Sequence, residues 1–187
     1  MKKDVSKRML ICLYLIIGLL VVNTIFTISN ATGDGNDNGK KQAEVNPDYD
    51  VSMMKSLNID EVIALFDTKE THVVYIGRAG CPHCVNYLPT LQRAQEEFNY
   101  VTIKVVADSP ENQDRESHAK LRDLLTMSYT METHNGTETK TFGEFFYEYG
   151  YVPTTFIIKD GKMADGFIGG RDFNDFVSFL EKNGITR

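Results

Sequence analysis

Cysteine is scarce in this chain. It has three cysteines in 187 residues, and Cys12 lies in an apolar stretch near the N-terminus, so only Cys81 and Cys84 remain beyond that stretch. This scarcity excludes the framework of several disulfides that stabilises many small secreted domains. It also argues against structural zinc, which takes about four ligands, because there is no second cysteine pair and the scattered histidines show no ligand spacing. We expect no metal and no cofactor.

Positive charge is also scarce. Lys and Arg number 20 against 26 Asp and Glu, which gives a formal net charge of −6. Residues 1–8 carry +3 and residues 9–31 carry none, so residues 32–187 hold −9. Nucleic-acid binding requires basic patches that attract phosphate, and a domain this acidic is unsuited to it. We therefore expect no nucleic-acid partner.

The long apolar run covers residues 9–28, twenty residues without charge. As a helix it would be about 30 Å long, enough to cross the hydrocarbon core of a bilayer, and it exceeds the roughly 7–15 apolar residues of a signal peptide. Because basic residues precede it, the positive-inside rule puts residues 1–8 in the cytoplasm and the rest outside. We expect a single-pass anchor in the cell membrane. Secretion after signal cleavage near Ala31 stays open as the alternative.

A polar stretch follows the apolar run. Residues 29–47 are rich in Asn, Asp and Gly, a composition typical of flexible linkers. We expect a flexible linker over residues 29–54 and one folded domain over residues 55–187, a length within the usual range for a single domain.

Within residues 55–187, helical and strand patterns alternate. Runs of β-branched residues indicate strands, and apolar residues at helical spacing indicate helices. Helices are expected after the capping residue Asn58, over residues 85–98, 114–131 and 142–149, and after the capping residue Asp172; strands over 73–76, 100–107, 156–158 and 163–168; a hairpin turn at 159–162; and an exposed loop over 133–141. A strand–helix–strand unit followed by a hairpin and a helix predicts an α/β fold, with a mixed central sheet and helices on both faces.

The chemistry of the sequence is concentrated at Cys81-Pro82-His83-Cys84, where a predicted strand passes into a predicted helix. At a helix N-terminus, unpaired N–H groups and the macrodipole favour a thiolate, so Cys81 would be the attacking sulfur. Cys84 follows one helical turn later on the same face, close enough to form a disulfide with Cys81 or to resolve a mixed disulfide. His83 can add positive charge or a hydrogen-bond donor. The spacing indicates a redox-active dithiol, with an inert structural bridge as the competing interpretation.

Over about residues 55–185, the chain resembles the thioredoxin superfamily. Besides the two cysteines, the matching features are Pro89 eight residues after Cys81, Val152-Pro153-Thr154 before a strand, the hairpin Lys159-Asp160-Gly161-Lys162, and Gly169 after the last strand. The resemblance implies a thioredoxin fold and a cis peptide bond before Pro153, which packs against the cysteines. The site residues it implies are Cys81, Pro82, His83, Cys84 and Pro153 for catalysis, and Val152 and Thr154 for binding an extended substrate.

Three features depart from reducing thioredoxins. Pro82-His83 stands where those proteins have Gly-Pro, Gly80 stands in place of a tryptophan, and Tyr75 stands in place of a buried acid. The Cys-Pro-His-Cys sequence and the valine before Pro153 resemble DsbA-type oxidases instead. A small anchored domain with this motif is similar to the thioredoxin-like accessory proteins of bacteriocin transport in Gram-positive bacteria.

We therefore expect a thiol–disulfide oxidoreductase outside the cytoplasm that forms or exchanges disulfides in secreted or surface proteins. A membrane redox partner is a further expectation. Two alternatives stay open: a reductase in the same place, and a non-catalytic module of a bacteriocin or peptide exporter that holds peptide in the groove at Val152 and Pro153. The Pro82-His83 pair favours the oxidising direction.

Overall fold

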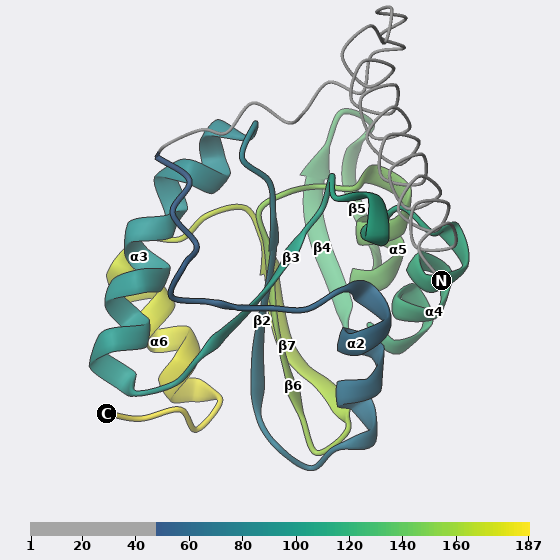
Figure 1. Cartoon of the computed structure of the whole chain (residues 1–187). Helices are drawn as coiled ribbons and strands as arrows, with labels where there is room; N and C mark the ends of the chain where they lie inside the picture. Colours follow the sequence, from purple (N-terminus) through teal and green to yellow (C-terminus); the bar gives the residue numbers. More distant parts are fainter. Residues whose placement is uncertain (1–47) are drawn as a thin grey trace, which may run out of the picture. The chain divides into compact units, whose positions relative to one another are not determined.

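The computed structural model describes residues 48–187. The basic segment 1–8, the expected anchor 9–28 and most of the expected linker lie outside the described residues, which Figure 1 marks by the grey trace. Among the helices of residues 48–187, none is both long and apolar enough to cross a membrane.

Five strands form one mixed sheet at the centre of this domain (Figure 1). They are β1 (Lys55–Ser56), β2 (His72–Gly77), β3 (Thr102–Val106), β6 (Thr154–Lys159) and β7 (Lys162–Ile168). Their order across the sheet is β1-β3-β2-β6-β7. β3 pairs in parallel with β1 and β2, whereas β6 pairs antiparallel with β2 and β7. The predicted hairpin between the last two strands is thereby confirmed.

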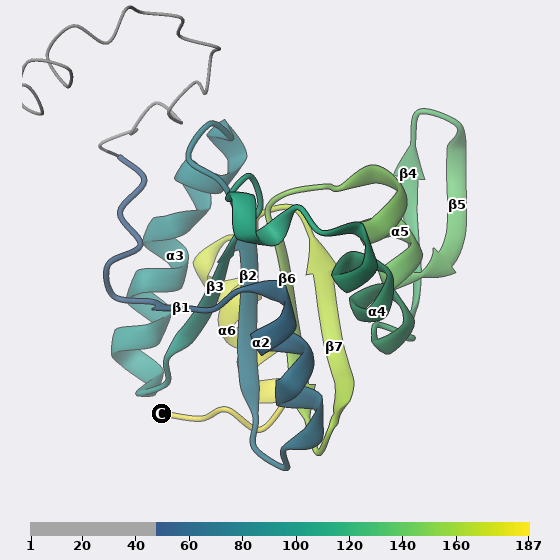
Figure 2. The same cartoon turned by 45° about the vertical axis from the view of Figure 1, so that its right-hand side comes forward.

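Helices cover both faces of the sheet. They are α2 (Ile59–Ala64), α3 (Pro82–Phe98), α4 (Arg115–Leu124), α5 (Phe142–Tyr149) and α6 (Phe173–Lys182), with 3₁₀ turns at Leu65–Asp67 and Pro110–Asn112. Figures 1 and 2 show α3 and α6 on one face and α2, α4 and α5 on the other. The predicted α/β architecture, a mixed sheet with helices on both faces, is confirmed.

The central strand β2 contributes to both cores. Val73 and Tyr75 belong to the core beneath α3 and α6, whereas Val74 and Ile76 belong to the core on the opposite face. Alternate side chains of a strand point to opposite faces, so a strand covered on both sides is apolar at every position. This explains why the continuous run at 73–76 predicted it.

The helix α3 begins earlier than its predicted start at residue 85. Cys81 is its N-cap, with an extended backbone, and Pro82 occupies the first turn, where a missing N–H costs no hydrogen bond. Pro89 lies inside the helix. The buried side chains of α3 are Cys84, Tyr87, Leu88, Leu91, Ala94 and Phe98. One face of α3 is therefore buried, as the apolar residues at helical spacing predicted.

The helix predicted over residues 114–131 is confirmed only in its first part, and the loop predicted over 133–141 is wrong. α4 ends at Leu124, and residues 128–141 form a separate two-stranded sheet of β4 (Ser128–Thr133) and β5 (Gly136–Thr141). Half-buried and exposed positions alternate along β4, which is the period of a strand. Gly136, the first residue of β5 after the turn, has a φ of 102°, a conformation that glycine adopts readily.

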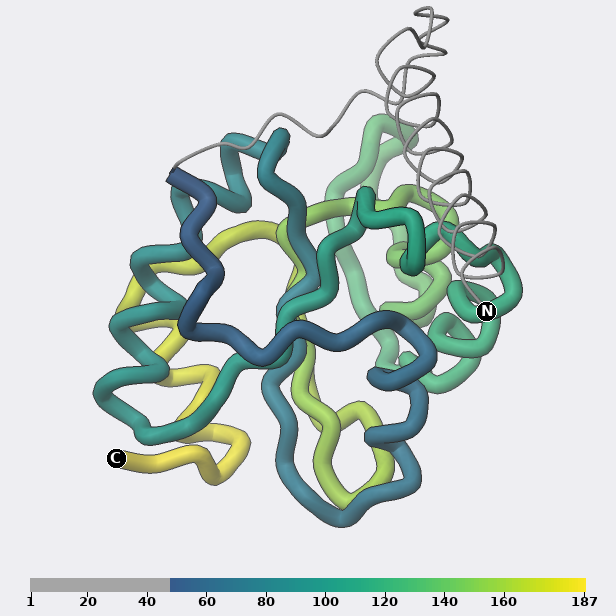
Figure 3. The backbone as a smooth tube through the Cα atoms, viewed as in Figure 1, coloured from purple at the N-terminus to yellow at the C-terminus, as the bar shows by residue number. Residues whose placement is uncertain are grey.

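Residues 48–54, expected as the end of the flexible linker, pack against the domain. Met54 is buried in the core beneath α3, and Tyr49 and Val51 pack against that core. The side-chain amides of Gln92 and Gln95 donate to backbone carbonyls of this segment, each at 2.8 Å. Figure 3 shows the segment running along α3 before the chain enters β1. The folded domain therefore includes residues before 55.

Candidate active site

Cys81 lies where the chain passes from β2 into α3. Its sulfur accepts a hydrogen bond from the Cys84 N–H, with N and Sγ 3.2 Å apart. The sulfur thus takes the role of a capping oxygen toward the free N–H groups of the helix. This N–H group and the positive end of the helix both face the sulfur. Cys81 is 6% exposed, next to the exposed residues Pro82 and His83.

Cys84 is fully buried one turn further along α3. Burial is the largest cause that raises the pKa of its thiol, to about 12, and a hydrogen bond with Cys81 acts in the same direction. Hydrogen bonds with the Arg78 backbone and, to a smaller extent, with the Tyr75 hydroxyl lower this pKa and so partly oppose the rise. Both cysteines are free thiols in the structure. Cys84 is thereby held as a neutral thiol behind the outer sulfur.

The loop before β6 reaches the sulfur of Cys81. The Cys81 Sγ lies 3.5 Å from the Val152 carbonyl oxygen, to which its thiol donates. The Val152–Pro153 peptide bond is cis, and Pro153 is buried. The Thr154 hydroxyl is turned toward the loop and donates to the Tyr151 carbonyl at 2.6 Å. The structure therefore brings Cys81, Cys84, Val152 and Pro153 together, whereas Thr154 supports the loop from within.

Two hollows are lined by neighbours of the cysteines, one by His83 and the other by Arg78 and Val152. His83 lines the first, together with Asn86, Tyr87, Gly170 and Arg171. The second, of about 130 Å³, is mainly apolar and is lined by Ile59, Ile76, Arg78, Val105, Ala107, His118, Phe146, Gly150 and Val152. Sequence reasoning missed Arg171, His118 and Phe146, because only the fold brings these distant positions to the motif.

Tyr75, the residue that stands in place of a buried acid, lies beneath the cysteines. It is completely buried, and its hydroxyl takes part in a hydrogen bond with the Cys84 thiol. The hydroxyl oxygen lies against Gly77, where a Cβ would be only 2.1 Å away. Position 77 is therefore restricted to glycine by the tyrosine two residues before it. Nothing in the local sequence indicates this contact.

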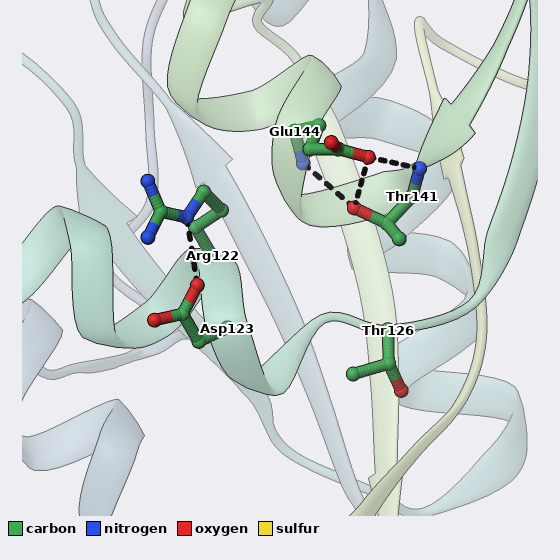
Figure 4. Close-up of a pocket in the computed structure, with 5 residues that line it drawn as sticks. All are labelled: Arg122, Asp123, Thr126, Thr141 and Glu144. Carbon is green, nitrogen blue, oxygen red and sulfur yellow. Dashed lines mark hydrogen bonds and ion pairs between the residues drawn. The ribbon is translucent and has the colours of Figure 1, made fainter.

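The pocket drawn in Figure 4 lies between α4 and the start of α5, and its residues serve the local structure. The Arg122 Nε donates to Asp123 at 2.7 Å. Thr141 and Glu144 form the capping box of α5, in which each side chain accepts a hydrogen bond from the backbone N–H of the other. Among residues 48–187, no cluster of side chains is arranged to hold a metal ion.

No protein-family model matches the chain, and no curated protein matches it. Among solved structures, it is similar to Fasciola hepatica thioredoxin, with 21% identity and a TM-score of 0.46 over 69% of this chain and 98% of that one. It is also similar to mitochondrial thioredoxin 3 of Saccharomyces cerevisiae in its oxidised form, with 18% identity and a TM-score of 0.43 over 72% and 94%. The corresponding values for Chlamydomonas reinhardtii thioredoxin f2 are 13% and 0.48 over 72% and 99%.

The domain has a thioredoxin-like α/β fold. This assignment rests on its own geometry: the mixed sheet, the helices on both faces, and the paired cysteines at the start of the helix that follows the central strand.

Proposed function

We propose that this protein is a thiol–disulfide oxidoreductase that acts outside the cytoplasm on cysteines of secreted or surface proteins. The environment of Cys81 carries the proposal. Its sulfur is the N-cap of α3, lies 3.5 Å from the Val152 carbonyl oxygen, and has the buried thiol of Cys84 behind it. One sulfur is thus placed to meet a substrate, and the other to complete the exchange.

The proposed reaction starts from the Cys81–Cys84 disulfide. A substrate thiolate attacks the Cys81 sulfur, forms a mixed disulfide with it, and displaces Cys84 as a thiolate that takes up a proton. A second thiolate of the substrate then attacks the substrate sulfur of the mixed disulfide and displaces Cys81. The substrate dithiol is thereby oxidised to a disulfide while the protein disulfide is reduced to a dithiol. A membrane disulfide-bearing partner would reoxidise the protein.

Substrate binding is proposed at the loop that carries Val152. Its backbone lies beside the Cys81 sulfur, so an extended peptide paired with it would present its cysteine to Cys81. The apolar hollow that Val152 shares with Phe146 can accept a neighbouring apolar side chain of that peptide.

The reduction potential of the Cys81–Cys84 pair tests the oxidising direction. Equilibration with glutathione, using the full-length chain with Cys12→Ser so that only the motif thiols respond, should give a value near the DsbA end of the range, about −120 mV, rather than the thioredoxin end, about −270 mV. A value at or below the thioredoxin end would contradict disulfide donation and favour the outward-facing reductase.

The proposed compartment has its own test. A maleimide that cannot cross membranes, added to intact cells after mild reduction, should modify Cys81. Modification only after lysis would contradict an extracytoplasmic site. The anchor over residues 9–28 and the N-terminus inside are proposed on the sequence.

The competing accessory role predicts that the cysteines are dispensable. In that case, cells that carry the double variant Cys81→Ser and Cys84→Ser keep full export activity. Loss of that activity with an intact protein level would support the oxidoreductase instead.

A further inference from the structure

The buried hydroxyl of Tyr75 is one of a pair. The Tyr49 hydroxyl, from the segment before β1, donates to the Tyr75 oxygen at 3.4 Å. Tyr75 is completely buried, whereas Tyr49 is only half-buried at the edge of the domain. On its other side the Tyr75 hydroxyl meets the Cys84 thiol. Three polar atoms therefore form a chain that runs from the buried sulfur toward the surface.

Both tyrosines are neutral at physiological pH, and burial makes their ionisation harder still. It is the largest cause that raises the pKa of Tyr49 to about 12, and it raises the pKa of Tyr75 further still. A neutral hydroxyl both donates and accepts a hydrogen bond, so it can pass a proton along without gaining a lasting charge. A buried carboxylate could act as a base here, but the hydroxyl pair cannot.

We propose that the Tyr75 and Tyr49 hydroxyls form the proton path between Cys84 and the solvent, and that Tyr75 donates a hydrogen bond to the Cys84 sulfur whenever that sulfur carries negative charge. The inference rests on the proposed function, because Cys84 changes its charge only if the dithiol reacts. It assigns a catalytic residue, Tyr75, and a positioning residue, Tyr49, neither of which belongs to the Cys-Pro-His-Cys motif.

The protons and electrons of this step balance in both directions. When a substrate thiolate attacks Cys81, the bonding pair of the Cys81–Cys84 bond leaves with the Cys84 sulfur. That sulfur takes the hydroxyl proton of Tyr75, and Tyr75 takes the hydroxyl proton of Tyr49. Water then gives a proton to Tyr49. When Cys84 resolves a mixed disulfide, its proton leaves along the same path. The thiolate then attacks Cys81, forms the Cys81–Cys84 bond and releases the substrate thiolate.

Other titratable and charged groups surround this path. They are Cys81 and Tyr87 of α3, Lys104 of β3, and the loop residues Asp50 and Asp108. Lys104 is the register partner of Tyr75 in the sheet, and burial lowers the pKa of its ammonium group. It is the most serious competitor for the proton role and needs a variant of its own.

Reaction of the reduced, full-length Cys12→Ser protein with Ellman's reagent tests the proposal. Cys81 attacks the aryl disulfide and releases one aryl thiolate, and Cys84 then resolves the adduct and releases a second. The two dithiol electrons thus reduce one aryl disulfide to two thiolates. In rapid mixing over a range of pH, the rate of the second release reports the thiolate fraction of Cys84.

Removing the Tyr75 hydroxyl should slow the second release at every pH below the pKa of Cys84. A charge-assisted hydrogen bond of the usual strength corresponds to roughly 10- to 100-fold in rate, or a displacement of the pH–rate profile by about 1–2 units to higher pH. We expect this for Tyr75→Phe, a smaller shift in the same direction for Tyr49→Phe, and no further shift in the double variant. The first release should be unchanged.

The direction of the displacement separates this role from a structural one. Because burial is the main cause of the high Cys84 pKa, a loosened core would expose the thiol and move the profile to lower pH. Tyr100→Phe is the matched control, since Tyr100 packs on the same core and its buried hydroxyl is not part of the Tyr49–Tyr75 pair. Its profile should stay in place.

Three outcomes would overturn the proposal. A profile of Tyr75→Phe that is unmoved or moved to lower pH contradicts the hydrogen bond to Cys84. A large shift with Lys104→Met and none with Tyr75→Phe assigns the role to the ammonium group. Release of a single aryl thiolate by the Cys12→Ser parent protein means that Cys84 does not resolve the adduct, which contradicts the proposed function itself and is distinguishable from the first two results.

Discussion

The two faces of the central sheet bury different kinds of side chain, although the same strands supply both. Beneath α3 and α6 lie Tyr75 and Tyr87, with the Cys84 thiol beside Tyr75. The buried cluster on the opposite face consists of aliphatic residues and phenylalanines. Within β2, the neighbours Tyr75 and Ile76 belong to different faces.

Because of this difference, the first face can take part in the reaction of the thiols, and the second face mainly stabilises the fold. Hydroxyl and thiol groups in a poorly solvated core have raised pKa values, and their hydrogen bonds can tune a reacting sulfur. An apolar cluster has no group to titrate, so away from the hollow at Val152 and Phe146 it contributes through packing alone. The separate sheet of β4 and β5 contacts α5, which packs with α4 on this second side. Changes on the first face should therefore alter rates and pH dependence, and changes on the second should alter stability.

The largest effect is expected for Cys81→Ser. Without the attacking sulfur, oxidation of a peptide dithiol by the full-length protein should fall to the uncatalysed rate, measured by mass spectrometry of the alkylated peptide. Cys12→Ser should keep the full rate. Leu121 is completely buried in the cluster on the second face, so Leu121→Ala should keep the rate per folded molecule. Residual turnover by Cys81→Ser would contradict the assignment of the attacking sulfur.

The next effect concerns stability on the second face. Phe142 is completely buried, and its ring packs edge-on against Tyr129 and Phe156 with centroid separations of 5.3 and 6.4 Å. Phe142→Ala should lower the free energy of unfolding by about 3–5 kcal/mol in a urea titration. Val101→Ala, at a position that is 57% exposed, is the control and should change it by about 0.5 kcal/mol or less. A changed pH dependence in Phe142→Ala would break the comparison.

A third effect is a loss of stability at high pH that comes from the first face. In the unfolded chain, Cys84 and Tyr49 ionise near their ordinary values, about 8.5 and 10, whereas the folded domain raises both pKa values to about 12. Between these limits the folded state holds more protons than the unfolded state. The free energy of unfolding is therefore undiminished below about pH 8.5. It falls as pH rises, by at most about 1.4 kcal/mol per pH unit for each group.

Urea titrations of the reduced protein across this pH range would measure the decline. The oxidised protein has no Cys84 thiol to ionise, so its free energy of unfolding should fall less steeply between about pH 8.5 and 10. Equal slopes in the two redox states would mean that Cys84 is not shielded from solvent as its burial indicates.

The central elements could be predicted because their own residues carry the signal. The run at 73–76 is apolar at every position, and the apolar stripe of α3 recurs at helical spacing. The caps of α2 and α6 were also visible: the Asn58 side chain accepts from the Glu61 N–H at 2.8 Å, and that of Asp172 accepts from the Asp175 N–H at 2.9 Å. Local chemistry alone decides such positions.

The β4–β5 hairpin could not be predicted in the same way. Its strands are rich in Thr and Glu and pair only with each other, so no continuous apolar run marks them. The leucines of α4 fall at helical spacing, and Ser128 continues that spacing into the first residue of β4. The helical spacing therefore extends into β4, and the alternation typical of a strand could not be recognised there.

The site was predictable only where its residues are adjacent in sequence. The two cysteines and the motif between them indicate dithiol chemistry by themselves, and the proline loop came from the resemblance to thioredoxins. The Tyr49–Tyr75 contact joins residues 26 positions apart, and Arg171 reaches the hollow beside His83 from beyond β7. Contacts of this kind depend on the fold, so the sequence pattern contains no trace of them.

The smallest effect is expected for the hairpin of β4 and β5. Its strands form a separate sheet, and all their positions are exposed or half-buried. The hydroxyls of Thr130 and Thr139 lie 2.8 Å apart across the two strands at an exposed position. Thr139→Ala should cost about 0.2–1 kcal/mol in the free energy of unfolding, and a double-mutant cycle with Thr130→Ala should assign most of that cost to the pair. Both release rates with Ellman's reagent should stay unchanged. If Thr139→Ala altered the second rate, the hairpin would be coupled to Cys84 across the sheet, and the division between a reactive face and a packing face would fail.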